Sequence, residues 1–304
     1  MDNNKIMIVG TGNVGASIAY AITQQRTAVN EIVLTDILAK DAEGEAMDLN
    51  DALAVAPSYV KIKNGTYKDA KDCDIVVIAA GAKQKPNESR LHLMRKNVNI
   101  LQGMIEQIMA SGFDGIFLVV TNPMDIMTYF AMKFSGLSSD KVIGSGTLLD
   151  SARLQKRIAE YLNVNPKSVH AYQVGEHGDS EVTLWSLAEV GGAKVSEMLP
   201  RETLAGISDY VKNEAYDIIQ KKGATHYGIA TCAVQIINSI LNDELRVLPV
   251  SSYDSFSETC YGWPSVVGRE GLVRRLDVKL SEKENIDLQK SINVLSKAIK
   301  SVKM

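Results

Sequence analysis

The chain has 304 residues, 45% of them hydrophobic and 23% charged, a composition typical of globular proteins that bury one large core or two smaller ones. A formal net charge of −3 without a run of Lys or Arg disfavours nucleic acid as a partner, and no apolar stretch approaches the roughly 20 residues that cross a bilayer. The polar start lacks the pattern of a signal peptide, and three widely spaced cysteines suit neither a disulfide framework nor a zinc site, so we expect a cytoplasmic protein without a metal.

Short β-branched runs alternate with helical patterns through the first half of the chain. The predicted strands cover residues 5–9, 31–35, 59–63, 74–79, 115–120 and 141–144. Several of these runs are apolar without alternation, as expected of a parallel sheet that helices cover on both faces. Apolar residues recur at helical spacing between them, for example over 14–23 and 97–110. The pattern predicts an α/β fold, a Rossmann-type doubly wound parallel sheet, over residues 1–144.

The alternation of strand and helix patterns stops after residue 145. A predicted helix over 147–162 precedes two segments, 168–175 and 181–190, whose lengths suit an antiparallel pair. Further along come predicted helices over 200–222 and 224–241, strand-like runs over 245–253 and 258–267, and a last helix whose start, Ser281 to Glu284, has capping-box spacing. This order predicts a mixed α+β domain over residues 145–304.

The first predicted strand runs directly into a glycine-rich turn that opens a helix. The turn reads GTGNVG, and its predicted cofactor-binding residues are Gly10, Gly12, Asn13, Val14 and Gly15. Bare backbone lets a pyrophosphate approach the N–H groups and the positive dipole end of the helix. Asp36 ends the second strand 21 residues after Gly15, where a carboxylate can accept hydrogen bonds from ribose hydroxyls and repel a 2′-phosphate. We therefore predict NAD rather than NADP; the alternative is a Rossmann domain that binds S-adenosylmethionine.

Residues 175–180 read GEHGDS, which places one of the four histidines between two glycines. A histidine can take up and return the proton that hydride transfer at a hydroxyl-bearing carbon requires, whereas the hexapeptide alone also suits a tight surface turn. Asp150 and Arg153 lie at i, i+3 in a predicted helix, where the aspartate could orient the imidazole and the arginine could bind a substrate carboxylate. Spacing alone favours an intrahelical salt bridge between these two residues.

Several motifs in order resemble those of the L-lactate and malate dehydrogenase family over essentially the whole chain. They are GTGNVG, AGAKQKPNESR, TNPMD, GSGTLLDSAR, GEHGDS and KKGATHYG. The resemblance implies hydride transfer between NADH and a 2-oxo acid. It implies His177 as the acid/base, Asp150 as its orienting partner, Arg153 as the clamp on the substrate carboxylate, Arg90 over the reacting carbonyl oxygen, Asn122 beside substrate and nicotinamide, Ser145 near the carboxamide, and Gly81 in the cofactor site.

Two positions bear on which 2-oxo acid the resemblance implies. Malate-specific members carry an arginine where this chain has the neutral Gln84, so a second substrate carboxylate would be buried without a counter-charge. Thr225 matches the position where lactate-type members carry threonine, which narrows the pocket toward a methyl group. Pyruvate and L-lactate fit best, with larger 2-oxo acids as the alternative. Lys83 and Lys85 flank Gln84, so a shift of one residue in register would restore a cation and favour malate.

The resemblance also bears on regulation and assembly. Many bacterial members are activated by fructose 1,6-bisphosphate through an arginine and a histidine; here Gln155 replaces the arginine while His170 is retained, so we expect weak activation or none. A homotetramer is implied by resemblance only. A non-catalytic dinucleotide-binding protein derived from this fold would be expected to lose catalytic positions, yet His177, Asp150 and Arg153 are all present.

Overall fold

A nine-stranded sheet forms the centre of the protein in a computed structural model that describes residues 4–82 and 90–302, except the side chain of Arg90. The strand order is β14-β13-β12-β6-β5-β4-β1-β2-β3, and the section from β6 to β3 is parallel. The parallel strands are β1 (Lys5–Val9), β2 (Glu31–Thr35), β3 (Lys61–Asn64), β4 (Ile75–Ile78), β5 (Ile116–Val119) and β6 (Val142–Gly144). The predicted Rossmann-type sheet is confirmed.

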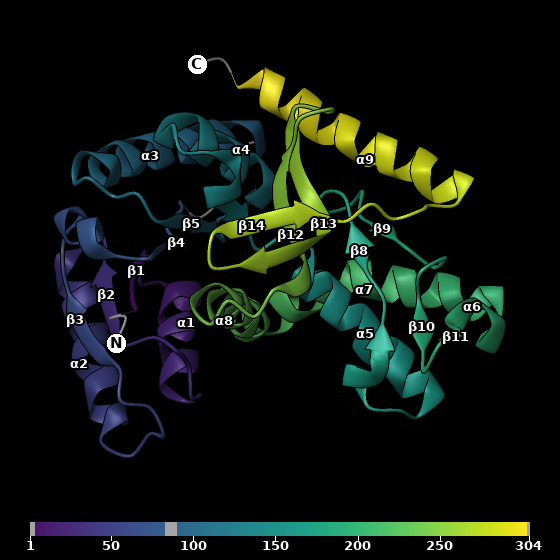
Figure 1. The fold of residues 1–304 in the computed structure, drawn as a ribbon, viewed down its shortest axis with the longest axis horizontal. Coiled ribbons are helices and arrows are strands. Elements are labelled where there is room, and N and C mark those ends of the chain that lie inside the picture. The colour runs from purple at the N-terminus through teal and green to yellow at the C-terminus, as the bar shows by residue number, and fades with distance from the viewer. Residues whose placement is uncertain (1–3, 83–89, 303–304) are drawn as a thin grey trace.

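Helices cover both faces of this sheet (Figure 1). One face carries α1 (Asn13–Thr23), α2 (Ala39–Leu53) and α8 (Tyr227–Leu241), and the other carries α3 (Arg90–Ala110), α4 (Met124–Ser135) and α9 (Glu282–Ser301). Short 3₁₀ turns are η1 (Tyr67–Asp72), η2 (Ser139–Lys141) and η3 (Pro166–Ser168). Strand residues alternate between the two cores: Ile6 and Ile8 of β1 pack on the first face, and Met7 and Val9 on the second. Both faces are therefore buried at the centre of the sheet, which explains why β4 and β5 are apolar throughout.

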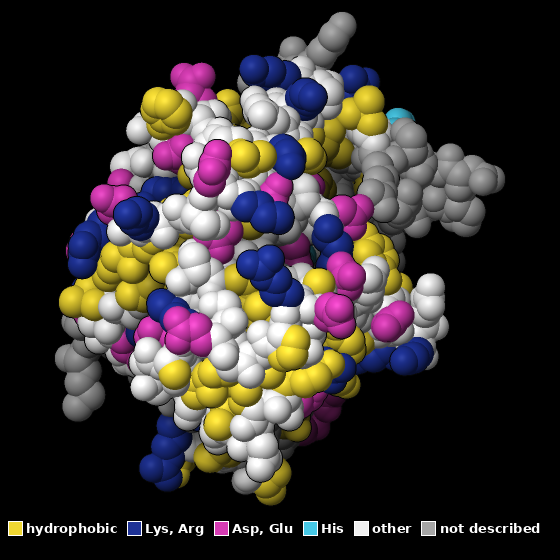
Figure 2. Space-filling model, turned by 90° about the vertical axis from the view of Figure 1, so that its right-hand side faces the viewer, with side chains coloured by type: hydrophobic (Ala, Val, Ile, Leu, Met, Phe, Trp, Pro, Cys, Tyr) yellow, Lys and Arg dark blue, Asp and Glu magenta, His cyan; other side chains and the backbone are white. Residues whose placement is uncertain are grey.

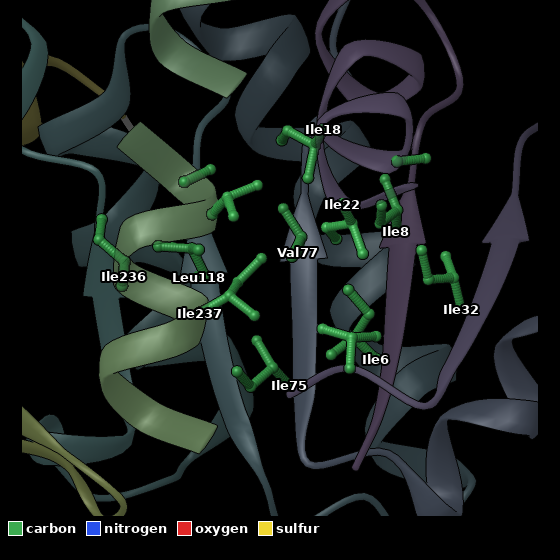
Figure 3. Close-up of a cluster of buried hydrophobic side chains, with 14 of the residues drawn as sticks. Ile6, Ile8, Ile18, Ile22, Ile32, Ile75, Val77, Leu118, Ile236 and Ile237 are labelled. Carbon is green, nitrogen blue, oxygen red and sulfur yellow. The ribbon is translucent and has the colours of Figure 1, made fainter. Parts of the chain in front are cut away.

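Helix α8 comes from the second half of the chain but packs on the nucleotide-binding sheet. Figure 3 shows Ile236 and Ile237 of α8 facing Leu118 of β5 and Ile75 of β4. Helix α1 lies beside it, and its Ile18 belongs to the same core. The capping box predicted at the start of α9 is present, because the Ser281 and Glu284 side chains bond each other's backbone N–H groups.

The second half forms smaller elements around α5 (Leu148–Leu162). They are β7 (Val169–His170), β8 (Gln173–Val174), β9 (Val182–Thr183), β10 (Glu189–Val190), β11 (Ala193–Lys194), α6 (Val195–Met198) and α7 (Arg201–Lys222). The predicted antiparallel pairing of 168–175 with 181–190 forms, but as two short contacts, β7 with β10 and β8 with β9. The GEHGDS segment is the connection between β8 and β9, so antiparallel strands hold both of its ends.

The last strands return to the central sheet. They are β12 (Arg246–Asp254), β13 (Thr259–Gly268) and β14 (Gly271–Arg275). Strand β12 pairs antiparallel with β6 through Ser251 and Gly144, and β13 and β14 extend the same edge. The sequence predicted strands over 245–253 and 258–267, but it indicated neither β14 nor this pairing with the parallel sheet.

The face of the molecule shown in Figure 2 is not dominated by one sign of charge. On the face shown in Figure 2, Lys and Arg side chains are interspersed with Asp and Glu side chains. Within the described ranges 4–82 and 90–302, no helix is both long and apolar enough to cross a membrane.

Candidate active site

The GEHGDS segment brings His177 against the start of α5. The imidazole Nδ1 lies 2.6 Å from Oδ2 of Asp150, whose side chain is buried in the first turn of that helix. The negative charge of Asp150 and the hydrogen bond to it raise the pKa of His177 from 6.5 to about 9, against the opposing effect of burial. The imidazole is therefore protonated at neutral pH, and its Nδ1 is held by Asp150 while Nε2 remains for a substrate.

The same carboxylate contacts the predicted carboxylate clamp. Nη1 of Arg153 donates to Oδ1 of Asp150 at 3.0 Å, and Nε of Arg153 lies 3.8 Å from Oε2 of Glu214 on α7. Burial opposes the charge of Asp150, but the charges of His177 and Arg153 and their hydrogen bonds outweigh it, so the pKa of this carboxyl lies below its ordinary value. Asp150 therefore makes both the intrahelical ion pair that the spacing predicts and the predicted contact with the imidazole.

A second aspartate, which the sequence did not single out, anchors the backbone of His177. Oδ2 of Asp125 accepts a hydrogen bond from the His177 N–H at 2.7 Å, and Oδ1 accepts one from the Ser251 hydroxyl at 2.6 Å. Burial raises the pKa of Asp125 to about 6, and the two hydrogen bonds partly offset this rise. Asp125 therefore joins α4, β12 and the GEHGDS segment. The available signal was an acid within the apolar run MDIM that opens α4.

Gly175, the first glycine of the segment, is required by contacts on either side. Gly175 has φ +86° and exchanges two backbone hydrogen bonds with Gly262 of β13, each 2.9 Å long. A Cβ on Gly175 would lie 2.5 Å from Oγ of Ser291 on α9, and that same hydroxyl accepts from the Glu176 N–H at 2.8 Å. The turn residues of GEHGDS thus permit a close approach to β13 and α9 that fixes the path of the chain into His177.

Glu181 is a further titratable group close enough to influence this pair. Its Oε1 accepts a hydrogen bond from Nε2 of Gln173 at 3.2 Å. Burial, and next the negative charge of Asp150, raise the pKa of Glu181 to about 8. Where Glu181 is ionised, its negative charge adds to that of Asp150 in favouring the protonated form of His177.

The glycine-rich turn is shaped to receive an anion. Helix α1 begins at Asn13 with no capping side chain and no acidic residue in its first turn, and a Cβ on Gly12 would meet nothing within 4 Å. A Cβ on Gly15 would lie 1.8 Å from the Gly10 carbonyl oxygen, so only glycine allows the helix to start this close to β1. Open space and unneutralised N–H groups at a helix start fit a pyrophosphate.

Asp36 lies beside that turn, at the end of β2. Its Oδ2 accepts from the Thr11 N–H at 2.8 Å, and its Oδ1 accepts from the Leu38 N–H at 3.1 Å. The carboxylate is half-buried and held next to the glycines, as binding of the adenosine ribose requires. The residues present therefore fit NAD.

The other predicted residues follow the carboxyl ends of the parallel strands. Gly81 follows β4, Asn122 follows β5, and the buried Ser145 follows β6, with its N–H bonded to the Val119 carbonyl at 2.9 Å. Asn97, which the sequence did not indicate, ties two of these loops together, because its side chain bonds the Ala82 N–H at 2.8 Å and the Asn122 carbonyl at 3.4 Å. Ligands of open α/β sheets bind at this edge.

Three further residues were predicted to contact the substrate. Thr225 is half-buried in the connection between α7 and α8. The predictions made for Gln84 and for the side chain of Arg90 lie outside the described residues. No group of three or more His, Cys, Asp or Glu side chains suited to a metal ion occurs among residues 4–82 and 90–302.

Comparisons with known proteins bear directly on this geometry. Residues 4–144 match the family model described as lactate/malate dehydrogenase, NAD binding domain, and residues 147–304 match the one described as lactate/malate dehydrogenase, alpha/beta C-terminal domain. The chain is 45% identical to L-lactate dehydrogenase 1 of Peribacillus psychrosaccharolyticus, over 97% of this chain and 96% of that one. It is 43% identical to L-lactate dehydrogenase 2 of Lactococcus lactis subsp. lactis, over 99% of both chains.

A solved structure gives the same result. The ligands-bound form of the minor L-lactate dehydrogenase from Enterococcus mundtii superposes with a TM-score of 0.97, at 42% identity over 100% of both chains. The predicted fold, the NAD cofactor and the class of NAD-dependent dehydrogenase are confirmed, and the S-adenosylmethionine alternative is excluded. The chain belongs to the lactate/malate dehydrogenase family.

Proposed function

We propose that this chain is an NAD-dependent L-lactate dehydrogenase that interconverts pyruvate and L-lactate. The observation that carries the proposal is the buried Asp150 carboxylate, which holds the imidazole of His177 at 2.6 Å and the guanidinium of Arg153 at 3.0 Å. The Asp150 carboxylate thereby places a proton donor, His177, next to a cation, Arg153. Reduction of a 2-oxo acid needs both, because its carbonyl oxygen takes up a proton while its carboxylate is bound. The full-length relatives named L-lactate dehydrogenase support the same activity.

The protonation of His177 suits the reduction of pyruvate. With a pKa of about 9, the imidazolium at neutral pH can give its Nε2 proton to the carbonyl oxygen of the substrate. Nicotinamide supplies or accepts the hydride when NAD is bound. Asp150 stays ionised throughout and keeps Nδ1 protonated, so the ring exchanges its proton with the substrate only at Nε2. In lactate oxidation the same nitrogen takes the proton from the hydroxyl.

Arg153 is proposed to bind the carboxylate of the substrate. Asp150 contacts its Nη1 and Glu214 approaches its Nε, so both carboxylates limit the rotation of the guanidinium. The side chain is 8% exposed, and an ion pair in such an enclosed site is stronger than one at the surface. Arg90, Asn122, Ser145 and Gly81 remain proposed contacts of substrate or cofactor.

Replacing His177 by asparagine tests the proposal. We expect pyruvate reduction to fall by about 10²–10⁴-fold, because a general acid is lost. NADH binding, measured by its fluorescence, should be nearly unchanged, because the glycine-rich turn and Asp36 lie in other elements. A variant that keeps most of its turnover would exclude His177 as the acid.

A substrate panel separates lactate from the other members of the family. Pyruvate, 2-oxoisocaproate and oxaloacetate are compared at saturating NADH by the loss of NADH absorbance. Pyruvate should give the highest kcat/KM, because Gln84 offers no counter-charge to a second carboxylate and Thr225 narrows the pocket. A preference for 2-oxoisocaproate or oxaloacetate would overturn this assignment without affecting that of His177.

We also propose weak activation, or none, by fructose 1,6-bisphosphate. Nε2 of Gln155 donates to the Ala171 carbonyl at 3.0 Å, so this amide ties α5 to the chain after β7. His170 is exposed on β7, and a single imidazole cannot form the forked contact that a guanidinium makes with a phosphate. Loss of a charge-assisted contact weakens phosphate binding by roughly tenfold or more. Pyruvate saturation curves with and without the bisphosphate should coincide at neutral pH, and a several-fold leftward shift there would refute the proposal.

The cellular setting and assembly are part of the same proposal. Cys73, Cys232 and Cys260 are buried thiols, as suits a protein of the reducing cytoplasm. Exposed apolar side chains on α1, α2 and α8, among them Tyr20 and Met47, favour association into the homotetramer. We further propose residues 1–144 as the NAD-binding domain and 145–304 as the substrate-binding domain. Light scattering after gel filtration measures the assembly, and a monomer would contradict it.

A further inference from the structure

His226 joins the connection between α7 and α8 to the helix that begins at the cofactor turn. Its Nδ1 lies 2.8 Å from the Ser17 hydroxyl of α1, and its Nε2 lies 3.0 Å from Nζ of Lys222, in the last turn of α7. An ammonium group can only donate, so Nε2 accepts from Lys222 and Nδ1 carries the proton that bonds to Ser17. Both hydrogen bonds therefore exist together only while the imidazole is neutral.

The rings around His226 strengthen this arrangement. The Tyr227 ring lies with its centroid 4.1 Å from that of His226, and Nζ of Lys222 lies 4.1 Å from the Tyr227 centroid. The His226 side chain thus links α7 and α1 to the connection between α7 and α8. Thr225, the residue proposed to narrow the substrate pocket, immediately precedes His226 in that connection.

The position of Ser17 gives the contact its significance. Ser17 is in the helix that begins at Asn13, one turn beyond the glycines proposed to bind pyrophosphate. Helices α1 and α8 pack together on the same face of the sheet. The Lys222–His226–Ser17 contact therefore fixes the distance between a substrate-pocket residue and the cofactor helix by hydrogen bonds that a proton can break.

We propose that His226 is a positioning residue for substrate binding: neutral, it holds Thr225 in register with the cofactor helix, and protonated, it releases the connection. This inference rests on the proposed function, because it concerns the proposed pocket residue Thr225. Protonation would place a second donor against the Lys222 ammonium and turn an attraction into a repulsion between two cations.

The charged groups that face His226 determine the pH at which its imidazole becomes protonated. Lys222 faces it from α7, while α1 contributes the neutral Ser17 and Tyr20 to the same cleft, whose volume is about 350 Å³. Glu45 and Asp48 of α2 also line this cleft. Partial burial, and next the Lys222 charge, place the pKa of His226 below its ordinary value. The histidine is therefore neutral at pH 7 and becomes protonated only in acid.

The test compares wild type with His226→Gln and Lys222→Gln. Glutamine can accept from Lys222 and donate toward Ser17 without titrating. The measured quantity is the ratio of the pyruvate KM of wild type to that of each variant, from about pH 5 to about pH 7.5. Because a ratio is taken, changes in KM that are common to both proteins cancel. We expect the wild-type KM to rise relative to His226→Gln in acid by roughly two- to tenfold, the effect of losing one hydrogen bond, while kcat changes less.

The Lys222→Gln variant removes a cation from an exposed position at the end of α7. Because release depends on repulsion between two cations, the loss of Lys222 should diminish the rise in KM, and any rise that remains should occur at higher pH, since this charge lowers the pKa of His226. A wild-type KM that follows His226→Gln at every pH, or a rise in Lys222→Gln with the size and midpoint of wild type, would overturn the inference. Failure of the proposed function would differ, since wild type would then turn over no pyruvate at any pH.

Discussion

Replacing Asp150 by asparagine asks whether one carboxylate sets the protonation of His177. Oδ2 lies 2.6 Å from Nδ1, and the charge of Asp150 is the main reason why the pKa of His177 rises from 6.5 to about 9. One pKa unit corresponds to about 1.4 kcal/mol, so this rise amounts to roughly 3 kcal/mol in favour of the imidazolium. Without the carboxylate, burial becomes the dominant influence, and we expect the pKa to fall to 6.5 or below.

The assay is the pH dependence of kcat/KM for pyruvate reduction, followed by NADH absorbance. Wild type should keep its rate up to about pH 9 and lose it above, because reduction needs the protonated form of a group whose pKa is raised. In Asp150→Asn, about one-tenth of His177 would be protonated at about pH 7.5, so the rate there should fall at least tenfold.

Partial recovery of Asp150→Asn in acid is the internal control, because a misfolded variant would not regain activity when His177 is protonated. Lactate oxidation, which needs the neutral imidazole, should lose its dependence on pH near 9 in the same variant. A falling limb that stays near pH 9 in Asp150→Asn would refute the assignment of that pKa to the His177–Asp150 pair.

Two further substitutions test the substrate contacts. Arg153→Lys should raise the pyruvate KM steeply in steady-state kinetics, since a point charge replaces a bidentate fork and loses the contacts with Asp150 and Glu214; an unchanged KM would place the carboxylate elsewhere. Gln84→Arg should shift the ratio of kcat/KM values from pyruvate toward oxaloacetate by about two decades, because the second carboxylate gains a counter-charge; an unaltered ratio would mean that Gln84 does not face the substrate.

The parallel half of the fold was predictable because its signals are local. Runs such as 5–9 and 31–35 are apolar, short and followed by glycine or an acid, and the structure places strands over these same residues. The pairing of β12 with β6 joins Ser251 to Gly144, more than a hundred positions apart, and no local pattern reports such a partner. Strand β14 reads GLVRR, whose arginines obscured an edge strand.

The candidate site divides in the same way. Histidine, aspartate and arginine in short motifs identified His177, Asp150 and Arg153, and the structure brings all three into contact. Asp125 acts through the backbone N–H of His177, a contact that depends on tertiary structure and leaves no periodicity in the sequence. Glu214 reaches Arg153 from α7 for the same reason.

The junction after β6 limits how this enzyme can move. The Thr147 N–H bonds to the Pro249 carbonyl at 3.0 Å, and the backbone of Gly146 passes so close to that oxygen that a Cβ would lie 2.2 Å from it. Among residues 4–82 and 90–302, α8 packs on the shared sheet and β12 pairs with β6, so the two halves of the chain are joined by a broad contact and not by one connection alone. A junction of this kind resists bending between the two halves, because a hinge needs a few residues that can change φ and ψ freely.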